Sequence, residues 1–277
     1  MKEGPKYRGI FQYIAENFDE QRKCSPEERF WVRDLEENQY PKLEGPVNRV
    51  EHEFETTEKA GKNIRSFAEA LGADLVGFTR VKEGMAFQDA DVKGRFAIVL
   101  GLRMDHSAIA TAPDPPAGKE ALRAYWVLGQ MVLKVAEYIR YLGYPAQGHQ
   151  VRTFLKDPPT ILHPLAAYHA GLGEFGRHGL LVTPEFGPRL RLGTITTDLE
   201  LPDEGPSPFG VEEFCQNCDL CMEACRGDAI PSEMRMERGI LKYTIDPMRC
   251  APEFARYDGC GICIKVCPFN RTIPLQL

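Results

Sequence analysis

The sequence contains no long apolar run that is free of charged side chains. Its most apolar stretch, residues 121–143, carries two arginines, one lysine and one glutamate. Four ionisable groups are too many for a helix that crosses a bilayer. The start of the chain also lacks the features of a secretory or twin-arginine signal. We therefore expect a cytoplasmic protein without a membrane span.

Basic residues are also in short supply. The chain has 34 Lys and Arg against 40 Asp and Glu, which gives a formal net charge of −6. Proteins that bind nucleic acids usually carry a basic surface, so we expect no nucleic-acid partner. With 277 residues, of which 43% are hydrophobic, the chain is long enough for one main core and a smaller satellite domain.

Cysteine is absent between Cys24 and Cys215, and eight cysteines then follow in the last quarter of the chain. They form two runs, at residues 215–225 and 250–267, and the spacing C-x2-C-x2-C-x3-C of the first run is typical of ferredoxins. In two-cluster ferredoxins the fourth Cys of a run ligates the other cluster. This rule predicts one [4Fe–4S] cluster at Cys215, Cys218, Cys221 and Cys267, and a second at Cys225, Cys250, Cys260 and Cys263.

Two other uses of these cysteines fit less well. Zinc sites usually use two separated Cys pairs, so the fourth Cys of the first run would be redundant. Disulfides require an oxidising compartment. The chain departs from the ferredoxin pattern at Arg226, where Pro is usual, and in the nine residues between Cys250 and Cys260, which we interpret as an inserted loop. Cys24 is interpreted as a free thiol, because the other eight complete two sites.

Upstream of the cysteines, helical and extended patterns alternate. Ser25 followed by Pro26 and Glu28 predicts a capped helix that runs to about residue 38. Apolar spacing predicts helices over 57–71 and 121–143 and a helical turn at 165–170. Extended segments are expected at 73–78, 96–102, 150–155, 180–183 and 189–199. This alternation indicates a three-layer α/β or α+β sheet domain.

The stretch 198–210 is rich in Pro, Gly and acidic residues and is expected to be a linker. We therefore predict three parts: an N-terminal helical extension at 1–55, a sheet domain at 56–205, and a two-cluster ferredoxin-like domain at 206–277.

A G-x-G-x-x-G motif occurs at Gly171, Gly173 and Gly176. In dinucleotide-binding proteins this motif follows a strand and opens a helix, whereas here a helical stretch precedes it and an extended stretch follows. A nicotinamide site is therefore not favoured. Two interpretations stay open: the glycines allow a ligand close to the backbone, with Arg177 facing an anionic group, or they form a tight turn.

Residues 170–188, AGLGEFGRHGLLVTPEFGP, and residues 196–199, TTDL, closely resemble the corresponding segment of corrinoid reductive dehalogenases. Epoxyqueuosine reductases share the layout but differ after AGLG. The resemblance covers roughly residues 47–270 and implies a nitroreductase-like α+β fold with a two-cluster module and base-off cobalamin near one cluster. It also implies that the cofactor-binding residues are Gly171, Gly173, Gly176, Arg177 and His178.

The D-x-H-x-x-G motif, which supplies a histidine ligand to cobalt in other corrinoid proteins, is absent, because none of the six histidines has Asp two residues before it. This absence agrees with the dehalogenases, which bind the corrin without a protein ligand to cobalt. An ordinary structural role remains open for each of the following histidines: His106, His149, His163, His169 and His178.

Two residues are candidates for the proton donor that a reduction needs. Tyr125 stands where dehalogenases have their catalytic Tyr, and Asp157 stands where epoxyqueuosine reductases have a catalytic Asp. Tyr125 is also compatible with packing in an aromatic core, and Asp157 with a turn before two prolines. A cation near Tyr125, such as Arg123 or Arg152, would favour proton donation.

The resemblance implies a cobalamin-dependent iron–sulfur reductase that cleaves a carbon–halogen bond of a small organic substrate through Co(I). Its electrons would come from an external low-potential donor, a ferredoxin or a flavodoxin. An epoxyqueuosine reductase-like enzyme is one alternative, and a non-catalytic electron-transfer or corrinoid-binding protein is another. The sequence departs from the dehalogenases in lacking an export signal and a segment beyond the clusters, and from the reductases in lacking a basic surface for tRNA.

Overall fold

The computed structural model describes residues 24–87, 90–149, 160–257 and 259–271. Its centre is a four-stranded sheet with the order β1-β2-β6-β3, in which all neighbouring strands are antiparallel. The antiparallel pairing makes the fold α+β, as the resemblance implied, and excludes a parallel α/β sheet. The strands are β1 (Leu75–Arg80), β2 (Phe96–Arg103), β3 (Ala146–His149) and β6 (Leu190–Thr197).

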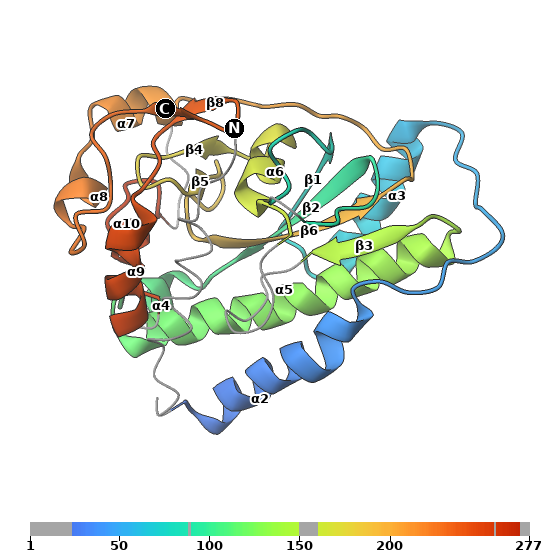
Figure 1. The fold of residues 1–277 in the computed structure, drawn as a ribbon, viewed down its shortest axis with the longest axis horizontal. Coiled ribbons are helices and arrows are strands. Elements are labelled where there is room, and N and C mark those ends of the chain that lie inside the picture. The colour runs from blue at the N-terminus through green and yellow to red at the C-terminus, as the bar shows by residue number, and fades with distance from the viewer. Residues whose placement is uncertain (1–23, 88–89, 150–159, 258, 272–277) are drawn as a thin grey trace.

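One face of the sheet is covered by α3 (Thr57–Ala70) and by the long helix α5 (Pro115–Tyr141), which runs beneath the sheet in Figure 1. Gly193 in β6 allows this contact, because a Cβ atom there would lie 2.7 Å from a methyl group of Val132 in α5. The side chains of Ile98 and Ile195, which face each other across β2 and β6, are completely buried in this core. The main hydrophobic core therefore lies between the sheet and α5.

The opposite face of the sheet is covered by α6 (His163–His169) and a small hairpin of β4 (Glu174–Phe175) and β5 (Leu181–Val182). A second core lies there and includes Val99, Leu165 and Leu181. The expected three-layer arrangement of helix, sheet and helix is therefore confirmed (Figure 1).

The N-terminal helix α2 (Pro26–Asp34) begins with the capping box that the sequence predicted, formed by Ser25 and Glu28. It continues through a π-helical turn, η1 (Leu35–Gln39), and a 3-10 turn, η2 (Tyr40–Lys42). The Trp31 ring stacks on Trp126 of α5 with 6.0 Å between centroids, and the Trp126 indole N–H donates to Asp34 at 2.8 Å. These contacts fix α2 against the outer side of α5.

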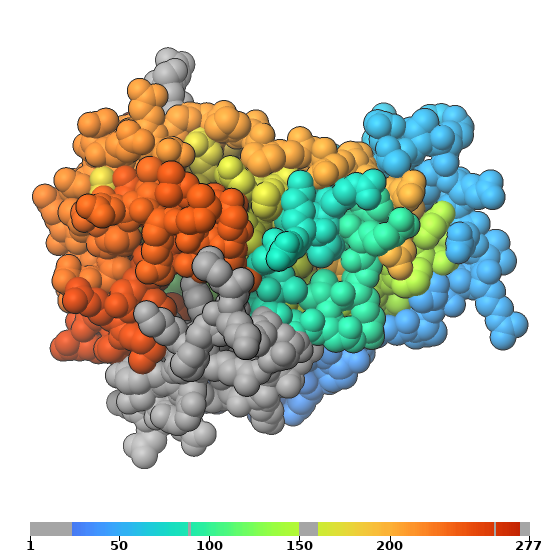
Figure 2. Space-filling view, turned by 45° about the horizontal axis from the view of Figure 1, so that its top comes forward, coloured from blue at the N-terminus to red at the C-terminus, as the bar shows by residue number. Residues whose placement is uncertain are grey.

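The cysteine-rich part is built from short elements at one end of the sheet domain, where its orange and red atoms gather in Figure 2. A third small core belongs to it. Arg189 next to β6 donates to Asn270 at 3.0 Å, and the Lys265 ammonium donates to the Ala112 carbonyl at 2.9 Å. The elements are α7 (Val211–Gln216), α8 (Leu220–Glu223), β7 (Arg235–Glu237), β8 (Ile240–Lys242), α9 (Pro247–Arg256) and α10 (Ile262–Lys265).

Most of the predicted elements are present with shifted ends. The helix expected at 121–143 begins at Pro115, after the short helix α4 (His106–Ile109). The extended segment expected at 150–155 lies outside the described residues, which hold β3 just before it. Among the helices that the structure describes, none is long and apolar enough to cross a membrane.

Candidate functional site

The glycine-rich turn after α6 owes its glycines to close contacts within the protein. Gly171 has φ = +70°, which favours glycine, and a Cβ atom on Gly173 would lie 2.1 Å from the Val182 carbonyl oxygen. The turn follows a helix and enters the β4–β5 hairpin, which is the reverse of the context that a dinucleotide-binding motif requires. Of the two open interpretations, the geometry supports the tight turn.

Arg177 belongs to this turn, and its side chain packs against the first cysteine loop, the loop of residues 215–225 that carries the first cysteine run. Its side chain is buried, and its guanidinium lies 4.6 Å from the centre of the Tyr243 ring. The guanidinium donates to the carbonyls of Cys215 at 2.5 and 3.1 Å, Cys218 at 3.0 Å and Ser232 at 3.1 Å. Within the described structure its hydrogen bonds are thus to backbone carbonyls, most of them in the first cysteine run, and the Asp219 carboxylate lies 3.3 Å from the guanidinium.

The Arg177 backbone N–H donates to the Cys215 sulfur at 3.4 Å. Three residues earlier, the buried Glu174 carboxylate accepts from the backbone N–H groups of Phe209 and Val211, where α7 begins. The turn therefore holds both ends of α7, and Cys215 lies near the C-terminal end of this helix.

All eight cysteines of the two runs are free thiols in the structure, and so is Cys24 just before α2. Burial raises the pKa of Cys267 to about 12, and the charges of the neighbouring Cys215, Cys221 and Cys218 act in the same direction. Across the described residues, no group of three or more His, Cys, Asp or Glu is arranged to hold a lone metal ion.

Burial also raises the pKa of thiols in the second cysteine run. Burial raises the pKa of Cys250 to about 11, and the neighbouring Cys225 and Cys260 also raise it. Burial raises the pKa of Cys263 as well, with Cys250 and Cys260 as its strongest thiol neighbours. The neighbours of Cys263 also include Cys221 and Cys225, so the assignment of the eight cysteines to two clusters stays a prediction. Because burial favours neutral thiols, positive metal charge would be needed to keep them as thiolate ligands.

Tyr125 of α5 lines a cavity of ≈170 Å³ at the junction of α5, α6 and β6. The Arg191 guanidinium carbon lies 4.9 Å from the centre of the Tyr125 ring. The Arg191 Nε atom is buried and has no hydrogen-bond partner in the structure. Apart from these two side chains and His163, the walls are apolar: Pro164, Leu180, Leu181, Pro188, Leu190 and Leu192.

Within the residues that the structure describes, the cation beside Tyr125 is Arg191, which the sequence analysis did not name. Arg123 instead donates to the Glu120 carboxylate at 2.6 and 2.7 Å, and this pairing raises the pKa of Arg123. Arg152 and the second candidate donor, Asp157, both lie outside the described residues. The sequence offered one signal for Arg191, a charged residue between two leucines in a predicted strand.

Two histidines near the cavity are neutral. Burial lowers the pKa of His163 to about 4, and its Nδ1 lies 2.9 Å from the Thr194 hydroxyl. Burial also lowers the pKa of His178 to about 4, and its Nδ1 accepts from the Leu180 N–H at 3.2 Å. A neutral His178 that accepts at Nδ1 carries its proton on Nε2, and this buried atom has no partner.

The other histidines have structural surroundings. His149 lies between the hydroxyls of Thr160 and Thr196, at 2.7 and 2.8 Å. His169 contacts the Tyr168 ring in an edge arrangement, and burial lowers its pKa. His106 begins the short helix α4.

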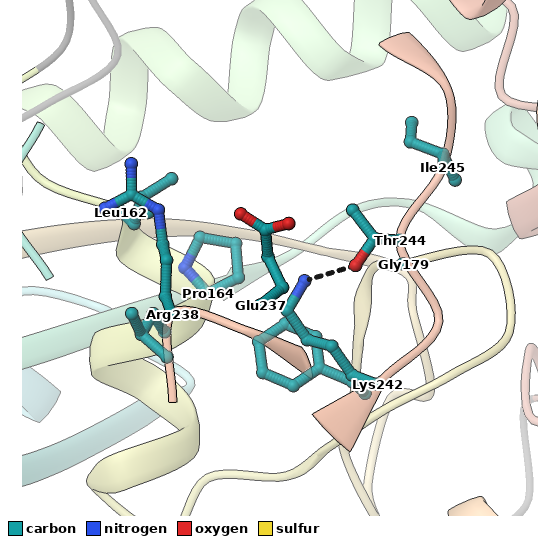
Figure 3. Close-up of a pocket in the computed structure, with 10 residues that line it drawn as sticks. Leu162, Pro164, Gly179, Glu237, Arg238, Lys242, Thr244 and Ile245 are labelled. Carbon is teal, nitrogen blue, oxygen red and sulfur yellow. Dashed lines mark hydrogen bonds between the residues drawn. The ribbon is translucent and has the colours of Figure 1, made fainter. Parts of the chain in front are cut away.

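A second cavity, of ≈140 Å³, lies between the start of α6 and the β7–β8 hairpin (Figure 3). The Lys242 ammonium is 3.4 Å from the Thr244 hydroxyl and 4.9 Å from the centre of the Phe175 ring, and burial lowers its pKa. Pro164 lines this cavity and the Tyr125 cavity, and the neighbours Gly179 and Leu180 each line one of them. The two cavities therefore flank the same turn.

Comparison with known proteins agrees with this organisation. The family described as "4Fe-4S dicluster domain" matches residues 214–271. A 4Fe–4S domain is therefore present, and it includes all eight cysteines of the two runs.

The tetrachloroethene reductive dehalogenase of Dehalobacter restrictus is 29% identical over an alignment of 279 positions, which covers 79% of this chain and 49% of that protein. The epoxyqueuosine reductase of Escherichia coli K12 is 35% identical over an alignment of 145 positions, which covers 48% of this chain and 37% of that protein. The chain thus spans about half the length, or less, of these curated relatives. Both relatives are oxidoreductases by name.

A solved reductive dehalogenase, described as suggesting a mechanism for B12-dependent dehalogenation, superposes with a TM-score of 0.78 at 25% identity. The match covers 87% of this chain and 37% of that one. The resemblance noted from residues 170–199, and the mixed helix-and-sheet fold that it implied, are therefore confirmed.

Proposed function

We propose that this homologue of reductive dehalogenases and epoxyqueuosine reductases is a cobalamin-dependent iron–sulfur reductase that removes a halogen from a small organic substrate. The observation that carries the proposal is the contact of Tyr125 with Arg191 in an apolar cavity. This cavity lies beside the turn whose Arg177 side chain donates hydrogen bonds to the first cysteine loop. A proton donor, a fixed cation and an electron-transfer domain are thus close together in the fold.

The cysteines would hold two [4Fe–4S] clusters, one at Cys215, Cys218, Cys221 and Cys267 and the other at Cys225, Cys250, Cys260 and Cys263. These clusters would supply electrons one at a time from an external ferredoxin or flavodoxin. The first site would be the nearer to the substrate cavity, because Arg177 of the adjoining turn binds its loop.

The fit to cobalamin is supported by two unsatisfied buried groups and by the two cavities. Arg191 Nε and His178 Nε2 lack partners, and both would suit the amide or phosphate acceptors of a polar cofactor. Each cavity is smaller than the roughly 300–1,000 Å³ of pockets that enclose whole ligands. We propose one extended ligand that reaches both sides of Pro164. Bound cobalamin would supply the reduced cobalt needed to cleave a carbon–halogen bond.

A base-off cofactor also agrees with the histidines. The proton of neutral His178 is on Nε2, because its Nδ1 accepts from the Leu180 N–H, so Nε2 has no free lone pair for a metal. His163 is held by Thr194. Neither presents itself as a cobalt ligand.

The protein's own part in the reaction falls to Tyr125 and Arg191. Replacing halogen by hydrogen consumes two electrons and one proton and releases halide. Tyr125 would give the proton to the reacting carbon, and the Arg191 charge would stabilise the phenolate that remains. The leucine and proline walls would exclude water and strengthen that interaction.

The proposal is tested with anaerobically purified protein reconstituted with hydroxocobalamin and then desalted. We expect retained corrin absorption, and chloride or bromide release from at least one of a set of alkyl, vinyl and aryl halides under a low-potential reductant. Retained corrin without halide release would favour an epoxyqueuosine reductase-like reaction. Loss of the corrin on desalting would favour a ferredoxin-like electron-transfer protein.

A further inference from the structure

The segment from β4 to β5 binds the first cysteine loop through two oppositely charged side chains, Glu174 in β4 and Arg177 in the turn that follows. Glu174 accepts from the backbone where α7 begins, and Arg177 donates to carbonyls where the helix ends. Both side chains are buried, with 7% and 3% of their surface exposed. This G-x-G-x-x-G segment therefore positions a metal site that belongs to another part of the chain.

Arg177 brings two electrostatic groups to that site. Its backbone N–H points at the Cys215 sulfur at 3.4 Å, and its guanidinium is held next to the loop by five hydrogen bonds to four carbonyls and by the Tyr243 ring. The only carboxylate that pairs with this guanidinium in the described structure is Asp219, at 3.3 Å, and its side chain is 53% exposed. Hydrogen bonds to sulfur and nearby charge are two of the factors that set the potential of an iron–sulfur cluster.

We propose that Arg177 is a positioning residue that raises the reduction potential of the [4Fe–4S] cluster at Cys215, Cys218, Cys221 and Cys267, and that Asp219 opposes it. This inference rests on the proposed function only in requiring that cluster. Reduction adds one electron to the cluster and neither forms nor breaks a bond to the protein. A fixed positive charge stabilises the more negative, reduced form, and a carboxylate destabilises it.

The experiment is a dithionite redox titration followed by electron paramagnetic resonance, on the cluster-loaded chain without corrin or substrate. For Arg177→Gln we expect one cluster to favour its oxidised form at least tenfold more, which is about 59 mV for a one-electron couple. Arg177→Lys keeps the charge but not the planar fork, so it should shift the potential less. Asp219→Asn should shift the same cluster in the opposite direction.

Arg140→Gln is the matched control, because Arg140 is also buried and donates to a carbonyl, that of Ala146 at 3.0 Å, but lies in α5. It should leave both potentials unchanged. Equal shifts of both clusters in Arg177→Gln, or no shift at full iron content, would overturn the inference.

If Arg177→Gln loses iron, the reduction potential of the Asp219→Asn variant still tests the inference. The Asp219 side chain makes no hydrogen bond as the cap of α8, so its loss should not disturb the fold. An unchanged or lowered potential in that variant contradicts the inference. A wild-type chain with fewer than two clusters would instead count against the proposed function.

Discussion

The Arg191 guanidinium carbon lies 4.9 Å from the centre of the Tyr125 ring, although the two residues belong to different layers of the fold. Tyr125 belongs to α5 and Arg191 to β6, and apolar side chains surround both. This pairing of a phenol with a permanent cation in an apolar cavity is the basis of the proton-donor role that we propose for Tyr125, because charge interactions are stronger where water is excluded.

The first prediction concerns the proton donor. Tyr125→Phe should lower halide release by about 100-fold or more, the usual contribution of a general acid, while iron and corrin content stay intact. Tyr138→Phe is the matched control, because Tyr138 is on the same helix and donates to Asn63 at 2.9 Å, away from the cavity. The measurement is halide release under a low-potential reductant.

Asp157→Asn serves as the competing variant and should cost less than Tyr125→Phe. The reverse ranking would indicate an epoxyqueuosine-type mechanism. Two active variants would mean that the proton comes from water or from another residue.

The second prediction separates the two arginines near Tyr125. Arg191→Gln should lower kcat by about 10- to 100-fold, since it removes the cation that stabilises the phenolate. Arg123→Gln should leave kcat nearly unchanged, because Arg123 is paired with Glu120. Steady-state kinetics of both variants, with corrin content measured in parallel, tests this, and a larger loss in Arg123→Gln would contradict our assignment.

The third prediction concerns Gly173. Gly173→Ala should lower stability by about 1–3 kcal/mol, because the new Cβ atom would lie 2.1 Å from the Val182 carbonyl and the backbone must shift. Gly45→Ala is the control, since the nearest atom to a Cβ there would be Nε of Arg140 at 3.3 Å, which requires a shift of only a few tenths of an ångström. Thermal unfolding checks both. An unchanged midpoint in Gly173→Ala, with loss of corrin alone, would restore a cofactor-binding role for this glycine.

The fourth prediction concerns removal of iron. Chelation under oxidising conditions should unfold residues 211–271 and leave the sheet domain folded. The third core is small and includes the buried Cys215 and Cys267, which would become unpaired thiols. Hydrogen exchange should show amides of β2 and β6 still protected. Loss of that protection would mean that the two parts unfold as one unit.

The fifth prediction is a loss of stability at low pH. Burial lowers the pKa of His163 to about 4 from 6.5, so between these values the unfolded chain binds a proton that the folded chain does not. The contribution of His163 is nearly complete at pH 7 and falls as the pH drops, by about 2 kcal/mol between pH 7 and 5. Urea unfolding at pH 7 and 5 measures it.

His163→Leu should reduce that pH dependence, and the remainder should include the contribution of His178, whose pKa burial also lowers to about 4. Thr194→Val removes the same hydrogen bond but keeps the imidazole, so it should leave the pH dependence in place. An equal pH dependence in His163→Leu and in the wild-type chain would refute the assignment.

Local sequence signals predicted the local structure. The capping box at Ser25 and the apolar runs of β2 and β6 were sufficient to locate those elements, since capping and burial act over a few residues. The strand pairing was not predictable in this way. β3 pairs with β6, about 50 residues further along the chain, and alternating helices and strands are equally compatible with a parallel sheet.

The candidate site was likewise predictable from the sequence only where its residues lie close together along the chain. Cysteine spacing predicts ligands because a cluster loop is a local structure. Arg191 was missed because its contact with Tyr125 exists only after β6 lies beside α5. For Arg177 the sequence left two roles open, a contact with an anionic group or a place in a tight turn. Its side chain lies against carbonyls of residues 215–218 and beside the Asp219 carboxylate, which are far away in the sequence.

Strand β5 is two residues long, and its residues belong to different cores: Leu181 to the core around α6, and Val182 to the core around Cys215 and Cys267. A ferredoxin excised at residue 206 would leave Val182, Glu174 and Arg177 behind. Its open surface would then lack a hydrophobic contact, a helix cap and a sulfur hydrogen bond. The cysteine-rich part therefore cannot be transferred to another protein on its own. A chimera that contains it must also include residues 174–182.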